Sequence, residues 1–265
     1  VLADWLAKIA EKDEDMILAL KHRRQAWRFE PTQRRLVSWC STLNQTPDDE
    51  ALREEIEFLE SQPGNNHLRL ISMLEVLAGD YDKLCRTLLD AEPLGWKLNN
   101  HPGFFLLPVT LIAGAGLKEL PEMSQLYQIS EDIKGLFVRW EQETNEAGSD
   151  DEFSSYLDFL FPALQKHPLS EEERVTFLRT AHTVLLKRLR AISNDHLEYA
   201  YHKVANQVAA FVEVCLLANR DSMAESFLTT VRNRFLRNTG LRSEIKLAMG
   251  ISRIIPVEFF KTASV

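Results

Sequence analysis

The chain has 265 residues, of which 45% are hydrophobic and 26% are charged. This content supports a sizeable core and excludes an intrinsically disordered chain. The formal net charge of −8 disfavours nucleic acid as the general partner, because phosphates repel a negative surface.

The cysteines and the start of the chain indicate the compartment. Cys40, Cys85 and Cys215 lie far apart, beside apolar residues and without a Cys-x-x-Cys spacing. They predict buried thiols in a reducing compartment, and therefore a cytoplasmic protein. No apolar leader follows Val1, so we expect no signal peptide and a start inside a longer protein.

The first third of the chain predicts amphipathic helices. One helical segment covers residues 4–29 with a break near 13–15, and a second begins at Pro31 with Leu36, Val37 and Cys40 on its apolar side. Thr46 and Pro47 followed by acidic residues predict the next helix start, with Thr46 as the cap. Its apolar stripe is Leu52, Ile56 and Leu59.

A helical hairpin is predicted over residues 67–89. Two short helices, 67–78 and 81–89, are separated by Gly79 and Asp80. Their apolar residues should face one another across the turn: Leu70, Leu74 and Leu77 against Leu84, Leu88 and Leu89.

The stretch from Leu94 to Leu117 is the most apolar of the chain, with no charged residue between Phe104 and Leu117. Its 14 uncharged residues fall short of the roughly 20 that a bilayer requires. We therefore predict a central helix, buried on every side, with Pro102 in its first turn. Gly114 and Gly116 could end this helix or admit a neighbouring backbone.

The second half of the chain also predicts a helical hairpin, with longer helices than the first. The polar run 144–151 is the best internal boundary, and limited proteolysis should cut there first. An aromatic helix follows from Phe153 through Phe161 and ends in the region of Pro162 and Pro168, and Ser170 caps a long helix to about Ile192. Helices over 197–218 and 222–236 form the last hairpin, with a turn at 219–221.

No segment alternates with a period of two, so we predict essentially no sheet. The predicted fold is all-α: roughly a dozen helices in an α-α superhelix of stacked hairpins, like TPR or HEAT solenoids. Residues 1–145 hold the shorter hairpins around the central helix, and residues 151–265 hold the longer ones. We expect the two halves to form one continuous superhelical unit.

Scattered short motifs carry a family resemblance. They are Gly79-Asp80-Tyr81, Gly95-Trp96, His101-Pro102-Gly103 with Pro108, a Tyr201 to Ala205 helix, and Arg232, Phe235 and Arg237. Over residues 70–260 the chain resembles the all-helical C-terminal region of uncharacterised bacterial proteins that carry SWIM-type zinc fingers. The zinc-ligand spacings are absent from this sequence. The resemblance therefore implies a fold and no chemistry.

No established catalytic motif occurs, so the sequence favours a protein that is not an enzyme and needs no cofactor. The best polar group surrounds Glu198 and His202, whose four-residue spacing would suit a metal in a helical-bundle enzyme. The simpler interpretation is an acidic first helical turn with half-exposed histidines. His101 is likewise interpreted as a helix-entry residue rather than a general base.

The tryptophans allow two interpretations. Trp5, Trp27, Trp39, Trp96 and Trp140 mostly have apolar neighbours. Together with phenylalanines they could line a groove, but core packing is favoured.

Charge is distributed unevenly along the chain. Residues 1–173 contain 17 basic and 32 acidic residues, a net charge of −15, whereas residues 174–265 contain 14 and 7, a net charge of +7. The basic part could dock on the acidic part of its own chain, meet an acidic protein, or contact nucleic-acid phosphates; it could also be a solvated face. The sequence predicts a non-catalytic interaction module with no membrane partner. Its predicted partner-binding residues are Arg232, Arg234, Arg237, Arg242 and Lys246.

Overall fold

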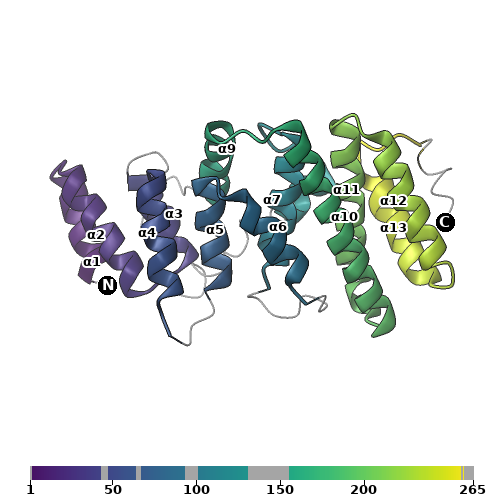
Figure 1. Ribbon diagram of the computed structural model, residues 1–265, viewed down its shortest axis with the longest axis horizontal. Coiled ribbons are helices and arrows are strands. Elements are labelled where there is room, and N and C mark those ends of the chain that lie inside the picture. Colours follow the sequence, from purple (N-terminus) through teal and green to yellow (C-terminus); the bar gives the residue numbers. More distant parts are fainter. Residues whose placement is uncertain are drawn as a thin grey trace. The chain divides into compact units, whose positions relative to one another are not determined.

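The computed structural model (Figure 1) describes residues 2–42, 47–63, 67–92, 101–130, 155–257 and 259. All regular secondary structure in these ranges is helical, which confirms the predicted all-α class without a sheet. The elements are α1 (Leu2–Lys12), α2 (Met16–Phe29), α3 (Gln33–Thr42), α4 (Asp49–Glu60), α5 (Leu68–Ala78), α6 (Tyr81–Asp90), α7 (Gly103–Ala115), α9 (Tyr156–Lys166), α10 (Glu171–Asn194), the 3-10 turn η1 (Glu198–Ala200), α11 (Tyr201–Leu217), α12 (Asp221–Arg234) and α13 (Thr239–Ile251).

The chain folds into two compact units that interleave in sequence. Unit 1 comprises Val1–Leu84 and Ile133–Pro168, and unit 2 comprises Cys85–Asp132 and Leu169–Val265. The predicted boundary at 144–151, with its expected proteolysis site, lies outside the described residues. The division into halves 1–145 and 151–265 therefore stays a prediction.

Local capping signals set several helix starts. Asp15 accepts the Leu18 N–H at 3.0 Å after the predicted break between α1 and α2. At α10, Ser170 and Glu173 form the predicted capping box. At α4 the cap is Asp48 rather than Thr46, because the extended backbone of Asp48 lets its carboxylate accept the Ala51 N–H at 2.8 Å.

One helix end lies within the predicted Pro162 to Pro168 region, and one predicted helix start was misplaced. Pro162 lies inside α9, which continues to Lys166. A proline removes a single N–H donor, and the remaining bonds and the packing of this helix tolerate that loss. The last hairpin begins with η1 rather than with one continuous helix, because the positive φ of 52° at His196 interrupts the backbone just before it.

The packing partners of α5 were not predicted. Gly79 ends α5 in the left-handed conformation, with φ of 75°, as a hairpin turn requires. The helices that α5 contacts most extensively are α4 and α9, not α6 as predicted. Tyr156 of α9 donates its hydroxyl to the Met73 carbonyl at 2.7 Å.

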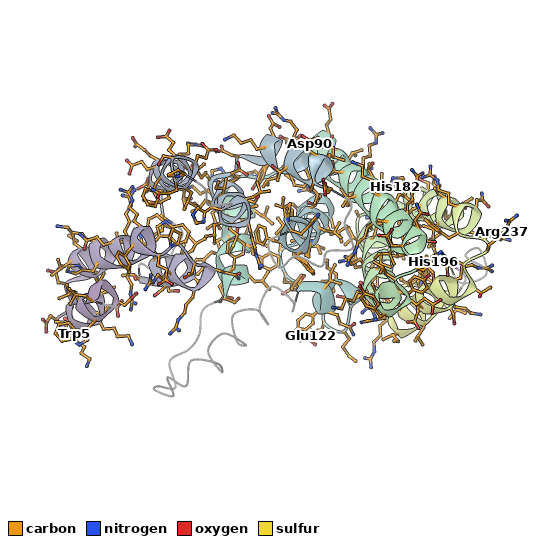
Figure 2. All side chains as sticks on the ribbon, turned by 90° about the horizontal axis from the view of Figure 1, so that it is seen from below. Trp5, Asp90, Glu122, His182, His196 and Arg237 are labelled. Carbon is orange, nitrogen blue, oxygen red and sulfur yellow. The ribbon has the colours of Figure 1, made fainter. Side chains whose placement is uncertain are left out.

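The core of unit 1 contains two tryptophans and a buried carboxylate. Trp27 and Trp39 are almost fully buried, as core packing predicted. Glu55 is also fully buried and accepts hydrogen bonds from the Trp27 indole at 2.9 Å and the Arg24 guanidinium at 2.6 Å. Trp5 contradicts the core expectation, since it is 58% exposed on α1 (Figure 2). Trp96 and Trp140 lie outside the described residues.

The core of unit 2 is organised around α7, as predicted. Every residue of α7 is buried except Phe104 and Ala115, and the helix packs against α10 and α11. Gly114 and Gly116, near the end of α7, have different roles. Gly116 ends the helix with φ of 64°, whereas a Cβ on Gly114 would lie 2.8 Å from the Leu178 side chain. In the described part of the chain, no helix is long and apolar enough to cross a membrane.

None of the three cysteines, all of which are described, is in a disulfide, and two of them are buried as predicted. Burial raises the pKa of both Cys40 and Cys215 to about 12. Cys85 is only half-buried, because it lies on the side of α6 next to its exposed residues.

Glu75 on α5 should give unit 1 a pH-dependent stability. Burial raises the pKa of Glu75 from 4.5 to about 7, against the opposing charge of Lys83 at 3.8 Å. At a pH between these two pKa values, Glu75 is protonated in the folded state but ionised in the unfolded state. The free energy of unfolding therefore falls as the pH rises from 4.5 to 7. Glu75→Gln stays neutral and lacks this contribution. Between pH 4.5 and 7, the free energy of unfolding of this variant, measured in urea, should therefore rise by roughly 1–2 kcal/mol relative to that of the wild type. A constant difference at all pH values would contradict the assignment.

Candidate functional site

The five predicted partner-binding residues all lie near the junction of α12 and α13 in unit 2. Arg232 and Arg234 are in the last turn of α12, Arg237 follows in the connecting turn, and Arg242 and Lys246 belong to α13. We call these five residues the basic cluster. All are exposed except Arg242, which is half-buried and donates Nη1 to the Leu236 carbonyl at 2.9 Å.

The exposed cations of the basic cluster form no ion pair with the described residues of their own unit. Among the described residues of unit 2, none forms an ion pair with Arg232, Arg234, Arg237 or Lys246. Arginines of unit 1 behave differently: Arg24 and Arg28 pair with Glu55, and Arg35 pairs with Asp4 and Glu30. The basic cluster therefore keeps its charge available to a ligand.

An open cavity of about 610 Å³ lies beside the basic cluster. It is bounded by the end of α10, the turn through η1, the end of α12 and the start of α13. We call it the α12–α13 cavity. Its lining residues are Ser193, His196, Glu198, Tyr201, Asn233, Arg234, Phe235, Leu236, Arg237, Asn238, Thr239 and Gly240.

Asn238 holds the walls of the α12–α13 cavity together. Its amide nitrogen donates to the Tyr201 hydroxyl at 2.8 Å and to Ser193 Oγ at 3.2 Å. Its side-chain oxygen accepts the Leu241 N–H at 3.0 Å, which caps the start of α13. One side chain thus joins α10, α11 and α13, so the cavity has a defined shape before any ligand binds.

Two groups that the sequence analysis kept separate meet in this cavity. Glu198, from the alternative metal site, lines the same space as Arg234 and Arg237. His196 also lines it, and Figure 2 shows His196 and Arg237 in unit 2, with Arg237 extending into solvent. The sequence offered no sign of this convergence, because 36 residues separate Glu198 from Arg234.

The positive charge of Arg234 lies close enough to the half-buried His182 to affect its pKa. His182 packs with its ring centroid 5.2 Å from that of Phe227. Burial lowers the pKa of His182, and the positive charge of Arg234 lowers it further. The region around the end of α12 is therefore electropositive.

The predicted metal geometry is not present. Glu198 lies in η1 and His202 on α11, so the two do not share one regular helical face, and only Glu198 lines the cavity. Across the described ranges, no group of three or more His, Cys, Asp or Glu could hold a metal ion. The physical reason is the change from the 3-10 turn η1 to α11 at Tyr201, which falls between Glu198 and His202.

His101 has the structural role that the sequence favoured. Its Nδ1 accepts the Gly103 N–H at 3.0 Å at the start of α7, and its Nε2 bonds the Glu92 carbonyl at 2.7 Å. Burial lowers the pKa of His101. The imidazole therefore joins the helix entry to the preceding chain.

Sequence reasoning missed the neutral residues of the cavity, including Ser193, Tyr201 and Asn233. Asn238 had a signal that could have been read, because Asn directly before Thr239 and Gly240 is a favourable helix cap. The other residues carry no local signal, since only the fold brings them together.

No family model, curated protein or solved structure matches this chain. The resemblance to the helical region of SWIM-containing proteins therefore stays a prediction.

Proposed function

We propose that this chain is a non-catalytic helical scaffold that binds an acidic protein segment through the basic cluster. The observation that carries the proposal is the set of exposed cations without ion pairs in the described part of unit 2. Exposed basic side chains attract an acidic partner, and the range of this attraction shortens as the salt concentration rises.

The packing of consecutive helices supports the scaffold part of the proposal. In unit 1, α1 packs with α2, α2 with α3, and α4 with α5. In unit 2, α10 packs with α11 and α11 with α12. Such neighbour-to-neighbour contacts are the pattern of stacked helical hairpins, which offer extended surfaces to protein segments. We therefore keep the α-α superhelix as part of this proposal.

An acidic protein explains the site better than nucleic acid does. Glu198 lines the cavity beside Arg234 and Arg237, and its charge would repel a phosphate backbone at close range. The net charge of −8 for the whole chain also opposes a long polyanion. A short acidic segment that contacts only the basic cluster avoids most of this repulsion.

The proposal can be tested with a labelled ten-residue peptide of alternating Glu and Ser. The wild-type chain should bind the peptide with an affinity that falls as salt rises. The double reversal Arg234→Glu, Arg237→Glu should weaken binding at least tenfold, because attraction becomes repulsion. Fluorescence anisotropy measures the affinity, and circular dichroism should show unchanged helicity and melting temperature, since both residues are exposed.

A matched control is available in unit 1. Lys8→Glu, Lys12→Glu makes the same change in net charge on exposed residues of α1, and should leave peptide binding nearly unchanged. Equal losses in both variants would show that only net charge matters. Tighter binding of an RNA or DNA strand of similar length would favour the nucleic-acid alternative.

A further inference from the structure

We infer that the α12–α13 cavity is an anchor pocket that holds one carboxylate side chain of the bound segment. The inference rests on the proposed function and adds a defined position to it. Of the basic cluster, only Arg234 and Arg237 line the cavity, whereas Arg232, Arg242 and Lys246 do not. We therefore call Arg234 and Arg237 the pocket pair, and we call Arg232, Arg242 and Lys246 the surrounding field.

The pocket pair has the chemistry that a carboxylate requires. Each guanidinium presents a planar fork of donors that matches the two oxygens of a carboxylate. Arg234 and Arg237 line the cavity together with Phe235 and Leu236, which lie between them in sequence and add apolar surface. The cavity volume of about 610 Å³ accommodates an acidic side chain with its flanking backbone.

Neutral donors complete the lining. Thr239 and Gly240 belong to the first turn of α13, where backbone N–H groups lack acceptors within the helix and the helix dipole favours negative charge. Asn233 adds a side-chain amide. These groups supplement the two arginines, which supply the net charge.

Glu198 sets the charge of the ligand that fits. Glu198 adds one negative charge to a lining that contains two arginines, so the lining as a whole carries a net charge of +1 for the ligand to balance. One aspartate or glutamate side chain provides that balance. A phosphate dianion would bring excess negative charge close to Glu198. The pocket should therefore prefer a carboxylate to a phosphate.

Two charge-matched double variants separate the pocket from the field. Arg234→Gln, Arg237→Gln removes the pocket pair, and Arg232→Gln, Lys246→Gln removes the same charge from exposed residues outside the cavity. With the Glu-Ser peptide in full-length protein, the first variant should lose at least tenfold in affinity and the second at most threefold. Equal losses would overturn the anchor pocket while leaving the proposed function intact. A wild-type chain that does not bind the peptide would overturn the proposed function itself.

A second arm tests the preference for a carboxylate. In a peptide of the same length, phosphoserine replaces each glutamate. The wild type should bind the glutamate peptide at least as tightly, and Glu198→Gln should increase the affinity for the phosphopeptide several-fold more than that for the glutamate peptide. Tighter binding of the phosphopeptide by the wild type, or an equal effect of Glu198→Gln on both peptides, would overturn the role given to Glu198. Unchanged melting temperatures confirm that each variant is folded.

Discussion

Leu111→Asp should remove most of the stability of unit 2. Leu111 is fully buried at the middle of α7, which packs against α10 and α11. A carboxylate at this fully buried position loses its hydration, and burying a charge in this way costs several kcal/mol. Since a domain is stable by about 5–15 kcal/mol in total, we expect loss of near-UV circular dichroism and a large fall in the urea midpoint. Leu107→Asp should behave in the same way, because Leu107 is equally buried.

The matched control for this prediction is Leu247→Asp on α13. Leu247 is 59% exposed, so the same chemical change should alter the free energy of unfolding by about 0.5 kcal/mol or less. A stable, monomeric Leu111→Asp protein with the wild-type urea midpoint would show that α7 is not the core of unit 2.

Glu55→Ala should have the largest effect on unit 1. The fully buried carboxylate of Glu55 accepts from Trp27 at 2.9 Å and pairs with Arg24 at 2.6 Å and Arg28 at 2.8 Å. Its removal leaves an indole N–H and two partly buried guanidinium groups without their shared acceptor. Breaking a buried pair in this way costs about 3–5 kcal/mol, and thermal and urea unfolding measure the loss.

The neighbouring glutamate provides the control. Glu54 also bonds Arg24 but is 54% exposed, and an exposed ion pair contributes about 0–1 kcal/mol. Glu54→Ala should therefore change stability by less than 1 kcal/mol, and Glu55→Gln should lie between the two alanine variants because it keeps an acceptor. Similar losses for Glu54→Ala and Glu55→Ala would contradict the buried network.

The sequence by itself determined most helix positions in the described residues. Helix starts and ends depend on groups within four residues, as at the Ser170 capping box of α10 and at Gly116 after α7. The burial of α7 was also predictable, because a helix without a polar face can be accommodated only inside a core. The error at Thr46 concerns which of several nearby signals acts, and it shifts a helix start without changing the class of the fold.

Only the tertiary structure decided which helices meet and what their meeting creates. The pairing of α5 with α9 depends on a chain segment that returns from more than 70 residues away. The same holds for the buried Glu213, whose carboxylate accepts the N–H groups of Gln125 at 2.8 Å and Leu126 at 2.9 Å. Nothing near Glu213 in sequence distinguishes it from a glutamate on a solvated helix face.

The sequence predicted the basic residues of the candidate site but not the cavity beside them. The concentration of arginines after residue 231 is visible in the composition, and the structure places these residues at one junction of helices. The walls of the cavity are joined by Asn238, which bonds Tyr201 and Ser193, and Glu198 lines the same space as Arg234 and Arg237. Charge is a property of each residue and can be read along the chain, whereas a cavity requires surfaces from distant segments and exists only once they have packed.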